Sequence, residues 1–161
     1  MKPSVLLDTS FFIRLLNDED SLHSNAKGYF RYFLENEIIL KVSTISIAEY
    51  CVRGKIDELP LRNIQIIPFN LDQAQRTGEF AKAIFEENKI QIEKLSPRAI
   101  IPNDSKLFAQ ADLDKSVTYF ITSDNRSKNT YSALKKRINP KFELVDISRP
   151  FNETFGLLDL Q

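Results

Sequence analysis

Short apolar runs alternate along this chain with longer segments in which apolar residues recur at helical spacing. The runs predicted to be strands are 5–7, 38–42, 64–69, 117–121 and 142–145, the last at an edge. Helices are predicted directly after the first strand, from residue 20 or 21, over 45–52 and 70–87, from residue 103 or 104, and over 127–138. Strands that alternate with helices indicate an α/β fold, with a mostly parallel central sheet of about five strands and helices on both faces.

Polar residues mark where several of these helices begin. Ser43 supplies a capping signal after the second strand, and Asn70 with Gln73 can form a capping box. Between 89 and 102 the pattern is irregular and includes two prolines. The tail, about 146–161, is apolar enough to pack but has no predicted place.

Length and composition narrow the class of protein. The 161 residues fit one domain, 1–161, and an apolar fraction of 42% is enough for a core. Only four glycines occur, which argues against a glycine-rich phosphate loop. With 22 basic and 22 acidic residues the net charge is zero, so nucleic-acid binding would need a local basic patch or metal ions that offset an acidic site.

Single residues add little more. Cys51 is the only cysteine, which excludes an intrachain disulfide and favours a cytoplasmic setting. The apolar run near the N-terminus is too short for a signal peptide or a membrane span. We expect Cys51 to be a small core residue. His23, the only histidine, is assigned no role.

Four acidic residues stand at comparable places in the predicted pattern. Asp8 follows the first strand, and Asp124 follows the fourth. Glu49 lies early in the helix after the second strand, and Asp104 begins the helix after the proline-containing segment. Because ligands gather beyond the carboxyl ends of the strands in an open parallel sheet, we expect all four at one edge. Such a cluster requires raised pKa values or a bound cation.

The acidic cluster favours Mg²⁺ or Mn²⁺ as the bound cation. Carboxylate oxygens suit these hard ions, and the chain has no second histidine or cysteine for a zinc site. Divalent ions held by carboxylates can hydrolyse phosphodiesters, since they lower the pKa of an attacking water and stabilise charge on the phosphate.

Four segments resemble, in order, the motifs of PIN-domain proteins. They are Val5-Leu6-Leu7-Asp8-Thr9-Ser10, Ser43-Thr44-Ile45-Ser46-Ile47-Ala48-Glu49, Pro102-Asn103-Asp104 followed by Leu107-Phe108-Ala109-Gln110-Ala111, and Phe120-Ile121-Thr122-Ser123-Asp124. Each motif alone is weak, but four in this order, covering about 4–138, form a fairly specific signal.

The resemblance implies a PIN-like nuclease with RNA as the expected substrate. It assigns catalysis and the binding of Mg²⁺ or Mn²⁺ to Asp8, Glu49, Asp104 and Asp124. Thr9 and Ser123 would donate hydrogen bonds to a carboxylate, a metal-bound water or a phosphate.

The chain also departs from the family pattern. Ser105 and Lys106 follow Asp104, where many relatives have small or apolar residues. Some relatives place a further acid near position 127, which is serine in this chain. Asn125 would replace that acid in part, so operation with one metal and with two both stay open.

The size of the chain is similar to that of small bacterial PIN proteins that look like VapC-type toxins, which are ribonucleases held silent by an antitoxin. By this analogy the expected partners are RNA, an antitoxin protein and a second copy of the chain. No residue in the sequence identifies an antitoxin.

Each acid also has an ordinary structural explanation. Asp8 and Asp104 could be helix caps, and capping does not exclude metal binding. Glu49 could be a surface residue of its helix, although its apolar neighbours predict a mostly buried helix. Asp124 could be a turn residue.

A basic segment begins beside the last of these acids. Residues 126–141 include six basic side chains and no acid. We expect Arg126 and Lys128 to bind the phosphates of the substrate. The basic residues at 135–137 are explained at least equally well by a solvated helix end.

Other functions compete with the metal-dependent nuclease. A degenerate PIN-like module would bind RNA or a protein without cutting, and the presence of all four acids argues against it. A receiver-type switch needs paired acids after the first strand and a lysine after the last, but Leu7 precedes Asp8 and Asp146 follows the last strand. An Asp-x-Asp phosphatase fails because residue 10 is serine. Cleavage of DNA in place of RNA stays open.

Overall fold

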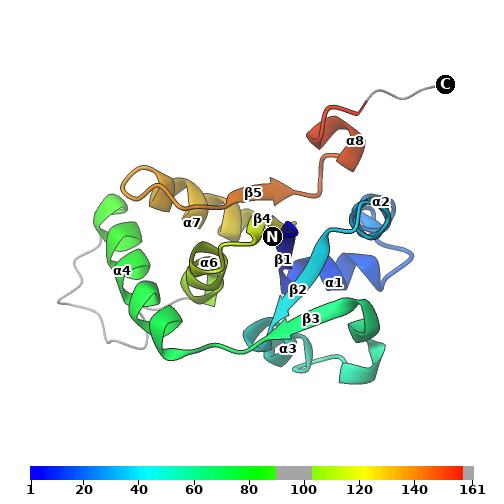
Figure 1. Ribbon diagram of the computed structural model, residues 1–161, viewed down its shortest axis with the longest axis horizontal. Helices are drawn as coiled ribbons and strands as arrows, with labels where there is room; N and C mark the ends of the chain where they lie inside the picture. The colour runs from blue at the N-terminus through cyan, green and yellow to red at the C-terminus, as the bar shows by residue number, and fades with distance from the viewer. Residues whose placement is uncertain (90–102, 158–161) are drawn as a thin grey trace.

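The computed structural model describes residues 1–89 and 103–157 and has a five-stranded sheet at its centre (Figure 1). All neighbouring strands run parallel, in the spatial order β3-β2-β1-β4-β5. The strands are β1 (Ser4–Leu7), β2 (Ile39–Ser43), β3 (Ile64–Ile67), β4 (Val117–Thr122) and β5 (Glu143–Asp146). The predicted α/β class and the edge position of the last strand are confirmed, and the sheet is wholly parallel.

Seven α-helices and two short 3₁₀ helices connect the strands within the described residues. They are α1 (Thr9–Leu15), α2 (His23–Glu35), α3 (Thr44–Tyr50), η1 (Ile56–Glu58), η2 (Leu61–Asn63), α4 (Leu71–Glu87), α6 (Asn103–Leu113), α7 (Asn125–Lys135) and α8 (Phe151–Thr154). The predicted helices are present with shifted ends. The irregular segment predicted at 89–102 lies, apart from Lys89, outside the described residues. No helix in the described ranges is long and apolar enough to cross a membrane.

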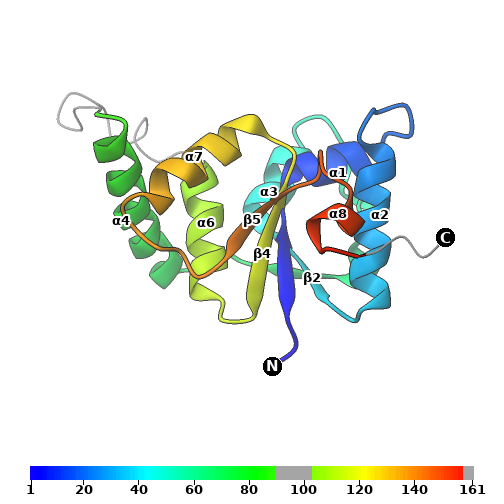
Figure 2. The same cartoon turned by 90° about the horizontal axis from the view of Figure 1, so that it is seen from above.

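The helices cover both faces of the sheet. In Figure 2, α4, α6 and α7 lie on one side of the strands and α1 and α2 on the other. Alternating side chains of β1 reach the two layers: Val5 and Leu7 pack with α1 and α2, and Leu6 packs with α4, α6 and α7. All three are fully buried. The chain that leaves the carboxyl end of β1 is therefore held between two packed layers.

The predicted burial of Cys51 is wrong, because this residue is exposed. It caps α3 after that helix ends at Tyr50, beyond the part of the helix that packs on α1 and β2.

The tail that had no predicted place forms α8 and packs on α2 (Figures 1 and 2). The hydroxyl of Tyr29 donates to the backbone oxygen of Arg149 at 2.7 Å. The ring of Phe155 stacks on that of Tyr32, with centroids 4.8 Å apart and 15° between the planes. The segment after β5 is thus tied to the second helix of the chain. Residues 158–161 lie outside the described ranges.

Candidate functional site

Two of the predicted acids begin helices at the carboxyl edge of the sheet. Asp8 follows β1 and caps α1, where its Oδ1 accepts a hydrogen bond from the backbone N–H of Thr9 at 2.8 Å. Asp124 follows β4 and caps α7, where its Oδ1 accepts from the backbone N–H of Arg126 at 2.9 Å. The sequence allows capping by Asp8, whereas its structural explanation for Asp124 is a turn residue. Capping uses one oxygen of each carboxylate.

Asp8 is a buried carboxylate, with an exposed fraction of 5%. Its second oxygen, Oδ2, accepts hydrogen bonds from the hydroxyls of Ser10 at 2.9 Å and Thr122 at 2.8 Å. These hydrogen bonds lower the pKa of Asp8, but burial has a larger effect and raises it to about 6. Repulsion from the charge of Asp104 raises the pKa as well. A carboxylate in this environment would be stabilised in its charged form by a nearby cation.

Asp104 lies in the first turn of α6 and is linked to α7 by the buried hydroxyl of Ser127, which donates to its Oδ1 at 2.9 Å. Burial raises the pKa of Asp104, and the charges of Asp124 and Glu49 raise it further. The charge of Asp104 in turn raises the pKa of Asp8.

Glu49 is half-buried on α3, and both of its carboxylate oxygens accept hydrogen bonds. The hydroxyl of Thr9 donates to Oε2 at 2.8 Å, and the side-chain amide of Asn103 donates to Oε1 at 2.6 Å. These contacts join α3 to the first residues of α1 and α6. The helix around Glu49 is less buried than predicted, since Ala48 is exposed.

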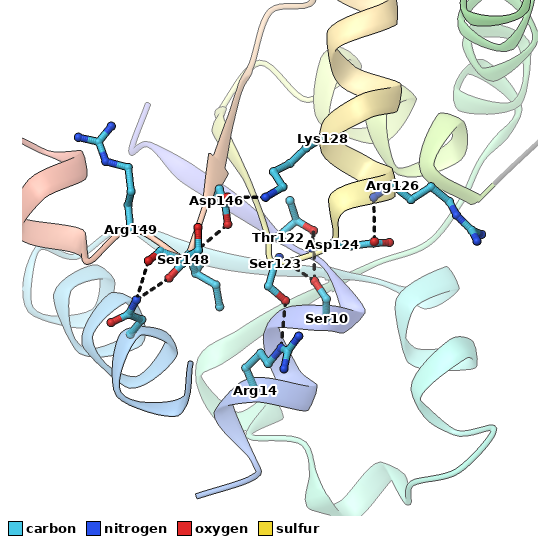
Figure 3. Close-up of polar contacts among 12 residues, drawn as sticks. Ser10, Arg14, Thr122, Ser123, Asp124, Arg126, Lys128, Asp146, Ser148 and Arg149 are labelled. Atoms are coloured by element: carbon cyan, nitrogen blue, oxygen red, sulfur yellow. Dashed lines mark hydrogen bonds and ion pairs between the residues drawn. The ribbon is translucent and has the colours of Figure 1, made fainter. Parts of the chain in front are cut away.

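The hydroxyls of Ser10 and Thr122 contact the turn that holds Asp124 (Figure 3). Ser10 Oγ accepts from the backbone N–H of Ser123 at 2.9 Å and lies 3.1 Å from Thr122 Oγ1. Thr122 Oγ1 accepts from the backbone N–H of Asp124 at 3.0 Å. Since each hydroxyl also donates to Asp8, the pair fixes Asp8 relative to this turn.

Of the residues expected to support the site, Thr9 contacts one of the acids, whereas Ser123 and Asn125 have other surroundings. Thr9 donates to a carboxylate, that of Glu49. The hydroxyl of Ser123 instead accepts from Nε of Arg14 at 3.4 Å, and Asn125 is exposed in the first turn of α7. Three hydroxyls that do donate to the acids had no local signal in the sequence, and they belong to Ser10, Thr122 and Ser127.

The cations expected to bind substrate have different surroundings. Arg126 is exposed in the first turn of α7, and its charge opposes the rise in the pKa of Asp104. Nζ of Lys128 lies 2.6 Å from Oδ2 of Asp146, at the end of β5 (Figure 3). The basic residues at 135–137 pair with glutamates of α4 and β5, in agreement with their structural explanation.

The donor chemistry of the four acids fits Mg²⁺ or Mn²⁺, although the side chains do not surround a single point. Within residues 1–89 and 103–157, no three Asp, Glu, His or Cys side chains lie close enough to hold a metal ion. The raised pKa values of Asp8 and Asp104 arise from burial and from the charges of neighbouring acids. A divalent cation would relieve both effects.

An apolar groove adjoins this edge and has Glu49 in its lining. It has a volume of about 600 Å³ and lies between α1, α3 and the segment after α3. Ile13 and Val52 line it with exposed fractions of 50% and 79%. A second carboxylate in the lining, that of Glu58, accepts a hydrogen bond from the hydroxyl of Tyr50 at 2.6 Å. The groove therefore combines an apolar surface with acidic side chains.

Comparison with known proteins identifies the fold. No protein-family model matches the sequence, and no curated protein matches it. The structure is similar to a chain of VapBC2 from Rickettsia felis bound to a DNA fragment from their promoter, with 18% identity, a TM-score of 0.54 and coverage of 88% of this chain and 97% of that chain. It is also similar to a chain of DNA-bound VapBC from Salmonella typhimurium, with 15% identity, a TM-score of 0.55 and coverage of 90% and 98%. At these identities the likeness establishes the fold alone.

Proposed function

We propose that this chain, which has the PIN-like fold expected from its four motifs, is a metal-dependent endoribonuclease. The observation that carries the proposal is the buried carboxylate of Asp8, held by Ser10 and Thr122 at the carboxyl edge of a parallel sheet. The charge of Asp104 raises the pKa of Asp8, and the charges of Asp124 and Glu49 raise that of Asp104. Clustered carboxylates with raised pKa values are typical of functional sites, and their oxygens suit hard divalent cations.

The four acids would hold Mg²⁺ or Mn²⁺ through their carboxylate oxygens. The ion, when bound, supplies an activated water and stabilises charge on the phosphate. The ligands are Asp8, Glu49, Asp104 and Asp124.

The other residues of the edge orient these ligands. Ser10 and Thr122 hold Asp8 through its Oδ2, and Ser127 holds Asp104. Such hydrogen bonds fix ligand orientation, and their loss typically lowers metal affinity or activity 10- to 100-fold. Arg126 offers an exposed guanidinium for a phosphate of the substrate.

The apolar groove supports control of this site by a protein partner, as in the VapC-type toxins and antitoxins that the chain resembles. Ile13 and Val52 leave apolar surface exposed, and Glu49 lines the groove at the acidic edge. An amphipathic segment with a basic residue could cover the apolar surface and pair with Glu49. The expected homodimer and cytoplasmic location remain predictions.

Cleavage of RNA tests the proposal directly. The purified chain is incubated with single-stranded RNA, structured RNA and DNA, each with Mg²⁺, Mn²⁺ or EDTA. We expect cleavage of RNA that requires both the metal and Asp8, so Asp8→Asn should be inactive. Asp18→Asn, which makes the same change at an exposed loop residue, should retain activity.

Metal binding separates the enzyme from its main alternative. Calorimetric titration with Mn²⁺ should show binding to the unmodified chain and weaker binding to Asp8→Asn. Absence of both cleavage and Mn²⁺ binding would favour a silent PIN-like module that binds RNA or protein. Cleavage restricted to DNA would correct the substrate class and keep the site.

A further inference from the structure

We propose that Arg14 is a substrate-binding residue, which contacts the phosphate backbone of the RNA on the α1 side of Asp124. The inference rests on the proposed nuclease function and adds a residue that lies outside all four motifs. It concerns how the substrate lies across the acidic edge.

Arg14 reaches from the last turn of α1 to the β4–α7 turn (Figure 3). Its Nε lies 3.4 Å from the hydroxyl of Ser123, the residue before Asp124. Its Nη1 lies 2.6 Å from Oδ2 of Asp20. The side chain is 35% exposed, so the guanidinium lies at the surface of the edge and is accessible to a ligand.

Asp20 holds this guanidinium in place. The carboxylate of Asp20 is itself fixed, because its Oδ1 accepts from the backbone N–H of Leu22 at 2.8 Å and its side chain is only 11% exposed. Within the described part of the chain, Nη2 of Arg14 has no hydrogen bond or ion pair. An arginine that is anchored on one side and open on the other is suited to a phosphate, which accepts paired N–H donors.

Arg14 and Arg126 lie on opposite sides of Asp124 (Figure 3). Arg126 makes no ion pair to any residue in the described ranges, whereas Lys128 is held by Asp146. Arg14 therefore adds a cation at this edge to Arg126 and Lys128, the two that the sequence predicts there. A polyanion that crosses four carboxylates needs cations besides the metal ion, and the two arginines supply them on either side of the reacting phosphate.

Binding of RNA as a function of salt tests Arg14 without requiring cleavage. The probe is a fluorescein-labelled single-stranded RNA of mixed sequence, with Mg²⁺, and all variants are made in the Asp8→Asn background. Arg14→Gln should raise the Kd about 10-fold at low salt and reduce the slope of log K against log salt by about 0.7, as expected for one lost phosphate contact. Arg14→Lys should restore the slope but only part of the affinity.

Two further variants separate binding from structure. Arg62→Gln makes the same change in charge before β3, at the opposite edge of the sheet, and should leave Kd and slope unchanged. Asp20→Asn frees Arg14 without removing its charge, so it should raise the Kd and keep the slope. If Arg14→Gln lowers the melting temperature and leaves the slope unchanged, the residue is structural and the inference fails alone. If the Asp8→Asn chain binds no RNA and the unmodified chain cuts none, both proposals fail.

Discussion

Replacement of Asp8 by asparagine removes a charge whose burial opposes folding. The carboxyl group is 5% exposed, and burial is the main reason that its pKa rises from 3.8 to about 6. The folded state therefore binds more protons than the unfolded state between these values, and stability falls as the pH rises through this window. A shift of about 2 pKa units corresponds to roughly 3 kcal/mol of unfolding free energy, lost by pH 7 in the metal-free protein.

Asparagine removes this penalty but cannot keep every hydrogen bond of the carboxylate. If the amide nitrogen of asparagine faces Ser10 and Thr122, it cannot accept their hydrogen bonds. If it faces the backbone N–H of Thr9, only that one hydrogen bond is lost. One lost buried bond costs about 1 kcal/mol. We expect metal-free Asp8→Asn to be more stable by about 2 kcal/mol at pH 7.5, or roughly 4–8 °C in melting temperature for a chain of this size. At pH 4 the advantage should vanish, because Asp8 is then protonated in the folded protein.

Thermal unfolding followed by circular dichroism, in EDTA at pH 4 and pH 7.5, measures this difference. Asp18→Asn is the matched control and should have the same melting temperature as the unmodified protein at each pH value. The reasoning is refuted if Asp8→Asn melts below the unmodified protein by the same margin at both pH values. Saturating Mn²⁺ should reverse the order at pH 7.5, since only the unmodified chain keeps all four proposed ligands and gains their binding free energy.

Three further substitutions test separate parts of the structure. Thr122→Val removes the hydroxyl that contacts Asp8 and Asp124, and cleavage should fall about 10- to 100-fold with unchanged far-UV circular dichroism; an unaltered rate would contradict the positioning role. Asp104→Asn should abolish cleavage and weaken calorimetric Mn²⁺ binding together, and retention of both would remove Asp104 from the site. Phe155→Ala should lower the free energy of unfolding in urea by about 2 kcal/mol and leave cleavage unchanged, because α8 packs on α2; a change in cleavage without loss of stability would oppose this reading.

The elements of the fold could be predicted because their signals are local. Ser43 caps α3, and Asn70 forms a capping box with Gln73, as the adjacent residues indicated. The strand ends could also be aligned without a structure, since parallel strands bring their carboxyl ends to one edge. This reasoning directed attention to Asp8, which directly follows β1, and to Asp124, which follows β4 after one residue.

The contacts between distant segments could not be predicted in this way. Thr122 meets Asp8 only because β4 pairs with β1, and nothing in the spacing of the chain specifies that pairing. The ion pair between Lys128 and Asp146 likewise depends on the pairing of β5 with β4, which the spacing does not specify. Arg14 had no local signal in the sequence, because it is a single basic residue in a helix whose other side is apolar. The residue that it contacts, Ser123, lies more than a hundred positions later in the chain.

The central position of β1 determines when, during synthesis of the chain, the acidic edge can assemble. The strand is made early, yet one of its two neighbours, β4, begins only at Val117. Until that segment leaves the ribosome, one side of β1 lacks its partner, and Asp8 lacks the hydroxyl of Thr122. Asp104 gains the hydrogen bond that orients it only after Ser127 has been synthesised. A nascent chain that stops short of α7 therefore lacks an assembled acidic edge, and the nuclease that we propose would become active only after this part of its synthesis is over.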